Sequence, residues 1–160
     1  MGVGSEPPPY IVHVPESSWM YRELTPRVLA QILAWEATMT TRDLEAFFDS
    51  GWNRHDVDFL MTFMSDDCVF ESTAGPEICG TRHAGRDRVR DAFARVFSVC
   101  PDATFANARH FVAANRGVSE WVFRGTTADG KRVEVNGCDI FTFSNDKIAI
   151  KTSYFKNRTA

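Results

Sequence analysis

The chain has 160 residues, of which 44% are hydrophobic and 24% are charged, and its formal net charge is −3. This length fits a single domain with a core, and the composition is that of a globular protein. Lysine and arginine are scattered along the chain, so we expect no nucleic-acid partner. Apolar runs stay below the ~20 residues of a membrane helix and no secretory pattern is present, so we expect a cytoplasmic location and no membrane partner.

The cysteines carry no pattern of a metal site or a disulfide framework. Cys68, Cys79, Cys100 and Cys138 stand singly, without CxxC spacing or a histidine at zinc-finger distance. We therefore expect free and mostly buried thiols. Metal-binding motifs such as HExxH and phosphate-binding glycine loops do not occur in the sequence. We expect a protein that works without a cofactor.

The first 40 residues differ in character from the remainder. Residues 1–15 include three consecutive prolines with glycine and serine, which offer little apolar surface to bury, so we expect a flexible tail. Residues 16–40 are expected to form a helical extension, because Thr25-Pro26 is a helix-start signal and apolar residues then recur at helical spacing to about Thr38. The main domain is expected over residues 41–160.

Two short helices are predicted at the start of this domain. Thr40 or Thr41 is expected to cap a helix that ends near Gly51. Asp56 is expected to cap a further helix, whose apolar face extends to Met64. Both helices therefore present one apolar face to a core.

From Cys68 the hydrophobic period changes from helical to strand-like. A strand is expected over 68–73, then a loop as far as Gly85, then a helix over 87–99. Three turn signals divide the remainder into four strands, 104–114, 118–127, 131–143 and 147–156. Helices, a strand, a helix and a meander predict an α+β domain in which one strongly curved, mostly antiparallel sheet wraps the helices.

Several short segments between residues 41 and 157 have a characteristic order and spacing. They are Trp52-Asn53-Arg54-His55-Asp56, Asp66-Asp67-Cys68-Val69-Phe70-Glu71, Gly85-Arg86-Asp87, Glu120-Trp121-Val122-Phe123-Arg124 and Asp139-Ile140-Phe141-Thr142-Phe143. Together they resemble the nuclear-transport-factor-2-like superfamily and its SnoaL-like domains. The resemblance implies a cystatin-like cone with an apolar cavity. Its members include ketosteroid isomerases, polyketide cyclases, limonene epoxide hydrolases and ligand-binding domains, so the fold does not fix the function.

The resemblance makes Asp139 the first catalytic candidate. Its position is similar to that of the acid that stays protonated in ketosteroid isomerases and donates a hydrogen bond to a developing oxyanion. The alternative is an ion pair with Lys151 or Arg124, because buried charges are usually paired. His83 is the second candidate, as a base at the cavity mouth that exchanges protons near neutral pH. A solvated loop histidine is the alternative for His83.

The other catalytic residues of the ketosteroid isomerases and of the limonene epoxide hydrolases are replaced in this sequence. Ser72 and Phe48 stand where the isomerases have their general-base aspartate and their oxyanion tyrosine. A serine cannot remove a proton from carbon without a base of its own. Val122 and Ser153 stand where the epoxide hydrolases have their two water-activating aspartates, and Glu120 stands where they have the arginine between them. We therefore expect neither mechanism.

The residues expected to line the cavity follow from strand alternation and the register of the family. They are Phe48, Phe70, Ser72, Glu120, Val122, Arg124, Val135, Lys151, Ser153 and Phe155. Charged residues among them have an alternative place on the wet face of the sheet.

Two functions remain open on this basis. One is a cofactor-free isomerase, cyclase or lyase that acts on a small apolar carbonyl compound through Asp139 and His83. The other is a ligand-binding or accessory domain that uses the same cavity without chemistry. A homodimer through the sheet face, which the resemblance implies, is compatible with both. An Asp139 bonded to Lys151 or Arg124 favours binding.

Overall fold

The computed structural model describes residues 39–158, so the expected tail and the expected helix over residues 25–38 lie outside the described residues. The helical part begins with α2 (Thr41–Ala46), which continues directly into the π-helix η2 (Phe47–Trp52) and is followed by α3 (Val57–Thr62). Thr40 caps α2, because its hydroxyl accepts from the Asp43 N–H while the Asp43 carboxylate accepts from the Thr40 N–H.

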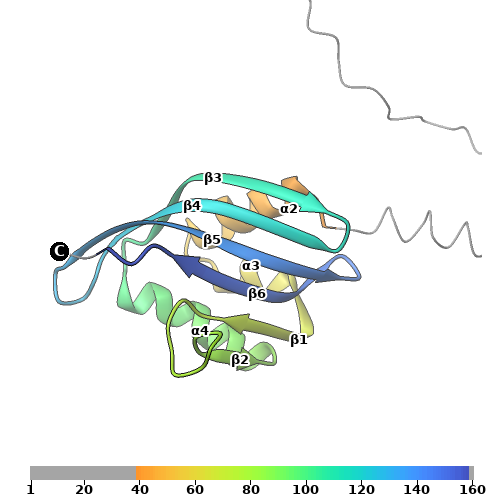
Figure 1. The fold of residues 1–160 in the computed structure, drawn as a ribbon, viewed down its shortest axis with the longest axis horizontal. Coiled ribbons are helices and arrows are strands. Elements are labelled where there is room, and N and C mark those ends of the chain that lie inside the picture. The colour runs from red at the N-terminus through yellow and green to blue at the C-terminus, as the bar shows by residue number, and fades with distance from the viewer. Residues whose placement is uncertain (1–38, 159–160) are drawn as a thin grey trace, which may run out of the picture. The chain divides into compact units, whose positions relative to one another are not determined.

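One six-stranded sheet in the order β2-β1-β6-β5-β4-β3 forms the other layer (Figure 1). Its strands are β1 (Met64–Glu71), β2 (Arg82–Ala84), β3 (Thr104–Ala113), β4 (Arg116–Thr126), β5 (Arg132–Ser144) and β6 (Lys147–Phe155). All neighbours pair antiparallel except β1 and β6, which pair parallel. This confirms the predicted α+β fold. The sheet stays open, with β2 and β3 at its edges.

The long strands and α4 (Arg86–Val99) are found close to their predicted positions. Strand β2 was missed, and a loop was wrongly expected in its place. Arg82–Ala84 pairs with the end of β1, with His83 opposite Phe70. The flanking Gly80 and Gly85 have φ of 87° and 88°. Glycines with positive φ are typical of loops, so the sequence predicted a loop here. In the structure the two glycines lie on either side of a three-residue strand.

The π-helix positions the aromatic side chains of the helical layer. Its backbone hydrogen bonds join residues five positions apart, as in the Asn53 N–H donating to the Phe48 carbonyl at 2.8 Å. Gly51 is needed here because an added Cβ would lie 2.4 Å from Leu60 Cδ2 of α3. This arrangement buries the π-helix side chains Phe47, Phe48 and Trp52.

The core lies between the helices and the inner face of the sheet, and it is mainly aromatic. Its largest buried members are Phe47, Phe48, Trp52, Phe93, Phe105, Trp121 and Phe141. Most of their ring pairs meet edge to face, such as Phe47 and Phe141 with centroids 6.1 Å apart. Aromatic rings of this size fill much of the interior that the resemblance implied to be a cavity.

Asn53 joins the helical layer to edge strand β3. Its Nδ2 donates to the Phe105 carbonyl at 3.2 Å, and the Phe105 N–H donates to its Oδ1 at 2.7 Å. His55 Nε2 lies 2.8 Å from the carbonyl oxygen of Ala103, just before the strand. The carboxamide therefore takes the place of a neighbouring strand at the start of β3.

The predicted state of the thiols agrees with the structure. All four cysteines are free, with Cys68 and Cys100 buried and Cys79 and Cys138 half-buried. Burial raises the pKa of the Cys68 thiol. Within residues 39–158, no helix is long and apolar enough to cross a membrane.

Candidate functional site

A buried ion pair lies on the inner face of the sheet. Asp139 on β5 is fully buried, and Lys151 on β6 is 2% exposed. The Lys151 Nζ donates to Asp139 Oδ1 at 2.7 Å and to Ser153 Oγ at 2.7 Å, and the Ser153 hydroxyl donates to Asp139 Oδ1. Strand register explains the contact, because Asp139 is opposite Ser153 and Lys151 is two residues earlier on the same face.

Trp121 on β4 supplies another donor to this carboxylate. Its Nε1 donates to Asp139 Oδ2 at 3.1 Å. Gly137, the cross-strand partner of Trp121, makes room for the indole, because an added Cβ would lie 2.2 Å from Trp121 Cη2. Both carboxylate oxygens of Asp139 are thus occupied by donors from β4 and β6.

Aromatic rings enclose the Lys151 ammonium. Its Nζ lies 4.8 Å from the centroid of Phe70 and 5.3 Å from that of Trp52, distances at which a cation is attracted to a ring face. Burial lowers the pKa of Lys151, and this effect outweighs the opposing attraction of Asp139. The buried amine is therefore deprotonated at lower pH than an exposed lysine.

One buried hydrogen-bond donor has no acceptor among the described residues. This donor is the Trp52 Nε1–H. Lys151 is not in this situation, because its Nζ has acceptors in Asp139 and Ser153 and lies over the rings of Phe70 and Trp52. A buried donor without a partner is costly. An acceptor oxygen placed beside the Trp52 Nε1 would satisfy this donor.

A polar row continues from Asp139 towards the edge of the sheet. Ser119 on β4 is opposite Asp139, and His110 on β3 is opposite Ser119. The His110 Nδ1 lies 2.7 Å from Ser119 Oγ. Burial lowers the pKa of His110, while the negative charges of Glu45 and Asp49 oppose this shift.

His83 is not brought to Asp139. It lies in β2, half-buried, with its ring nearly parallel to that of Phe70 at a centroid distance of 5.8 Å. Phe70 in turn pairs with Lys151 on the opposite side of β1. Strand β1, which carries Phe70, therefore lies between the two predicted catalytic residues, His83 and Asp139. Among the described residues, no hydrogen bond joins them.

The other predicted lining residues divide between two faces. Phe48, Phe70, Lys151 and Ser153 are buried, and Val135 and Phe155 lie on the face of β5 and β6 that carries Asp139. Glu120, Val122 and Arg124 instead lie on the outer face. Strand alternation requires this once Ser119 and Trp121 point inward. Glu120 pairs there with Arg109 at 3.0 Å, and Arg124 with Glu134 at 2.8 Å.

Ser72 has a local role just beyond the end of β1. Its hydroxyl donates to the Ala74 carbonyl at 2.9 Å and accepts from the Thr81 N–H at 3.2 Å. These bonds close the loop between β1 and β2. The serine therefore stabilises that loop, whereas the prediction had placed it in the cavity lining.

Sequence reasoning did not single out Trp52, Ser119 and Trp121 as site residues. Side chains alternate between the two faces of a strand, so when Ser119 is opposite Asp139 and points inward, Trp121 two residues later also points inward. The sequence therefore contained a signal for Ser119 and Trp121. That register follows from the hairpin between β4 and β5. No comparable signal marks Trp52, whose direction depends on the π-helix.

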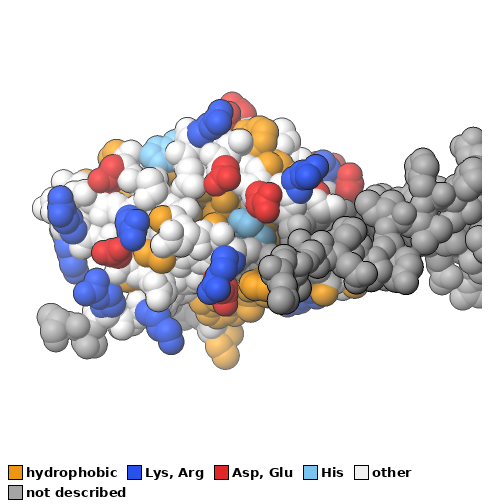
Figure 2. Space-filling view, turned by 90° about the horizontal axis from the view of Figure 1, so that it is seen from above, with side chains coloured by type: hydrophobic (Ala, Val, Ile, Leu, Met, Phe, Trp, Pro, Cys, Tyr) orange, Lys and Arg blue, Asp and Glu red, His pale blue; other side chains and the backbone are white. Residues whose placement is uncertain are grey.

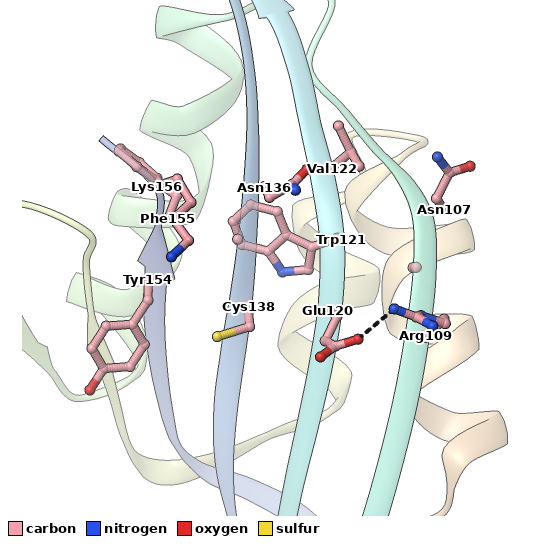
Figure 3. A pocket seen from close by; sticks show the side chains of 12 residues that line it. Asn107, Arg109, Glu120, Trp121, Val122, Asn136, Cys138, Tyr154, Phe155 and Lys156 are labelled. Carbon is pink, nitrogen blue, oxygen red and sulfur yellow. Dashed lines mark hydrogen bonds and ion pairs between the residues drawn. The ribbon is translucent and has the colours of Figure 1, made fainter. Parts of the chain in front are cut away.

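A separate hollow of about 840 Å³ lies on the outer face of the sheet, with the helices behind the strands (Figure 3). Its lining includes Arg109, Glu120, Val122, Asn136, Cys138 and Tyr154. The ion pair of Arg109 and Glu120 crosses its floor (Figure 3). Neither Asp139 nor Lys151 lines this hollow.

Charges of both signs are interspersed on the surface that Figure 2 shows. Lysine and arginine side chains alternate there with aspartate and glutamate. Within the described residues, no group of three or more histidine, cysteine, aspartate or glutamate side chains is placed to hold a metal ion.

The chain belongs to the SnoaL-like domain family, whose profile matches residues 44–150. A comparison with curated proteins finds no match.

Solved structures of the same fold come from several bacteria. A proposed polyketide cyclase from Pseudomonas putida KT2440 is 21% identical, with 74% of this chain and 92% of that chain covered and a TM-score of 0.64. An NTF2-like protein of unknown function from Mesorhizobium loti is 26% identical, covering 73% and 91%, with a TM-score of 0.59. A protein with a ketosteroid isomerase-like fold from Catenulispora acidiphila, in complex with trimethylamine, is 16% identical, covering 73% and 88%, with a TM-score of 0.60.

Proposed function

We propose that this chain binds a small, largely apolar molecule inside the cone, with a carbonyl or carboxylate oxygen directed at the Trp52 N–H. The observation that carries the proposal is the buried Trp52 N–H without a partner among the described residues. Aromatic side chains around it provide the apolar contacts that small-molecule sites use. The complex of the Catenulispora protein with trimethylamine supports the use of this fold for small ligands.

In this proposal Asp139 is the structural partner of Lys151. Its two oxygens accept from Lys151, Ser153 and Trp121, which supports ligand binding over the role of a neutral acid. The isomerase route has no support from Ser72, whose hydroxyl is used in a loop. The proposed site is therefore the unpartnered Trp52 N–H beside the pair.

Two probes of similar size and shape test this proposal. Cyclohexanone and methylenecyclohexane differ in one acceptor oxygen, so we expect the ketone to bind about tenfold more tightly, as one hydrogen bond to a buried donor allows. The Trp52→Phe variant should lose most of this preference, and Arg124→Met on the outer face should keep it. Equal affinities of the wild-type protein for the two probes, measured by NMR titration, would contradict the proposal.

A homodimer through the outer face is the second part of the proposal. Tyr154 is 52% exposed beside the hollow of Figure 3, and an exposed aromatic at a concave surface is typical of protein interfaces. We expect the wild-type protein to sediment as a dimer and Tyr154→Glu to sediment as a monomer, because the new charge would be buried. A wild-type monomer at micromolar concentration would rule this interface out.

A further inference from the structure

The loop between β1 and β2 presents one large apolar side chain to solvent. Ile78 lies at the tip of this loop and is fully exposed. The backbone groups of Glu77 and Gly80 bond to each other in both directions at 3.0 Å, so Ile78 and Cys79 form the tip of a tight turn. Burial of an isoleucine side chain is favourable. In one copy of the chain, the described residues leave this gain unused at Ile78.

Hydrogen bonds hold the loop in one shape. The Ser72 hydroxyl donates to the Ala74 carbonyl at 2.9 Å, and the Ser72 N–H donates to the Thr81 carbonyl at 3.0 Å. The Thr81 hydroxyl donates to the same Ala74 carbonyl at 3.2 Å. Gly80 is needed at the base of the tip, because an added Cβ would lie 2.0 Å from the Ser72 carbonyl oxygen. A loop fixed in this way loses little conformational entropy when its tip is bound.

The loop begins at the end of the sheet that carries the outer hollow. Glu71, the last residue of β1, is opposite Thr152 on the parallel strand β6. The loop starts one residue after Glu71, and β6 continues from Thr152 to Tyr154 and Phe155, which line the hollow. In Figure 1 the loop lies below the arrowhead of β6. Within one copy Ile78 does not fill the hollow, because it is fully exposed and is not among the lining residues.

The hollow and the tip are complementary in shape and charge. The hollow has a volume of about 840 Å³, and Val122, Tyr154 and Phe155 give it apolar walls. Lys156 also lines it (Figure 3). Neither Lys156 nor Glu77, the residue before Ile78, forms an ion pair within residues 39–158. The tip therefore offers a carboxylate beside an apolar side chain, and the hollow offers an ammonium group beside an apolar wall.

We infer that the Ile78 tip of one copy of this chain inserts into the outer hollow of a second copy, and that the tip of the second copy inserts into the first. A two-fold axis makes this exchange reciprocal, because both copies then use the same surface patch. The inference rests on the proposed homodimer and names the residue that the second copy contributes to the hollow. In this arrangement the Glu77 carboxylate approaches the Lys156 ammonium group of the other copy.

Sedimentation equilibrium of the full chain tests the inference. We expect Ile78→Ser to raise the dimer Kd by at least about a hundredfold, because two isoleucine side chains then leave the interface. Val99→Ser is the matched control, since Val99 is an exposed apolar residue at the end of α4, and it should leave the Kd unchanged. Thermal unfolding should show that both variants remain folded. A dimer of unchanged affinity in Ile78→Ser would overturn the inference.

The same measurement separates this inference from the homodimer on which it rests. A wild-type protein that is monomeric at micromolar concentration would refute both. A wild-type dimer that Tyr154→Glu dissociates and Ile78→Ser does not would leave the homodimer standing and refute the insertion of the tip.

An exchange of charges tests which groups meet across the interface. Glu77→Lys and Lys156→Glu each bring like charges together, so each should raise the dimer Kd. The double variant restores a pair of opposite charges and should return the Kd close to the wild-type value. A double variant weaker than either single variant would contradict the contact.

Two native thiols report on the contact directly. Cys79 is next to Ile78 at the tip and Cys138 lines the hollow, whereas Cys68 and Cys100 are buried. A short bis-maleimide should therefore join Cys79 of one chain to Cys138 of the other, and peptide mass spectrometry of mixed isotope-labelled and unlabelled protein identifies links between chains. Links between chains that join only two Cys138 side chains would place the hollows against each other and overturn the inference.

Discussion

Lys151 and Asp139 are individually costly residues that the fold tolerates only together. Removing two charges from water carries a large penalty, which their contact offsets only with good geometry and further hydrogen bonds. Ser153 and Trp121 provide those bonds. The pair therefore specifies how β4, β5 and β6 align, because a shift of one residue would separate all four side chains.

Single substitutions in this pair should be severe, and a double substitution should be mild. Asp139→Asn and Lys151→Met each leave one buried charge without its partner, so we expect each to lower the free energy of unfolding by about 3–5 kcal/mol. The double variant Asp139→Leu with Lys151→Met should recover most of this loss. Urea denaturation measures all three.

The exposed pair of Arg124 and Glu134 is the matched control. Their side chains are 51% and 57% exposed, and an ion pair in water contributes little, so Arg124→Met should cost less than about 1 kcal/mol. Equal costs for Arg124→Met and Lys151→Met would show that burial of the inner pair is not what makes it important.

His110 gives the stability of the domain a pH dependence of known sign. Burial holds its pKa below the ordinary value of 6.5, against the pull of Glu45 on α2 and Asp49 on η2. The unfolded chain therefore binds this proton more readily than the folded one does. The contribution of neutral His110 to the free energy of unfolding is therefore complete above pH 6.5. It is lost as the pH falls through the lower pKa that His110 has in the folded protein.

We expect the free energy of unfolding to fall between pH 7.5 and pH 5.5 by more in the wild-type protein than in His110→Asn. Asparagine retains a group that can bond to Ser119 and does not titrate. Denaturant titrations of both proteins at the two pH values measure the difference. A decrease of the same size in both proteins would mean that His110 keeps an ordinary pKa in the fold.

At the scale of elements, the helical layer and the sheet are joined at the start of β3. The Asn53 carboxamide satisfies both backbone groups of Phe105, and an edge strand with free backbone groups is otherwise open to pairing with another chain. Phe105 also packs against Trp52 with ring centroids 5.2 Å apart. The position of Trp52 near the site therefore depends on this contact.

Two substitutions of Asn53 separate its donor from its acceptor. Asn53→Asp keeps an oxygen for the Phe105 N–H and replaces the donor by a second oxygen facing the Phe105 carbonyl, whereas Asn53→Ala removes both. We expect each to destabilise the domain by about 1–3 kcal/mol, the cost of leaving a partly buried group unsatisfied. Hydrogen exchange at the Phe105 amide should accelerate in Asn53→Ala and remain slow in Asn53→Asp. Fast exchange in both variants would contradict this account.

The elements differ in how far the sequence determines them. Strands β3 to β6 were predictable because glycine, asparagine and aspartate turns separate long apolar stretches. Strand β2 was not, because three residues between two glycines carry no periodicity. The choice of Lys151 over Arg124 as the partner of Asp139 depends on register, which turn geometry sets and residue types do not reveal.

At the scale of the whole domain, a sheet with one wet face and one enclosed face leaves two surfaces for function. The outer face carries the ion pairs and the hollow of Figure 3. The inner face carries the aromatic core and the polar row from His110 to Ser153. In the proposed function, the residues on the inner face determine which ligand the cone accepts.

The indole N–H of Trp52 reports most directly on this ligand. Its signal in a proton–nitrogen correlation spectrum is assigned by its loss in Trp52→Phe. The account predicts that cyclohexanone moves this signal downfield, as expected for a newly formed hydrogen bond, and that methylenecyclohexane does not. A Trp52 signal that stays in place at saturating ketone, or that moves equally with both probes, would contradict the claim that the cone receives an acceptor oxygen at Trp52.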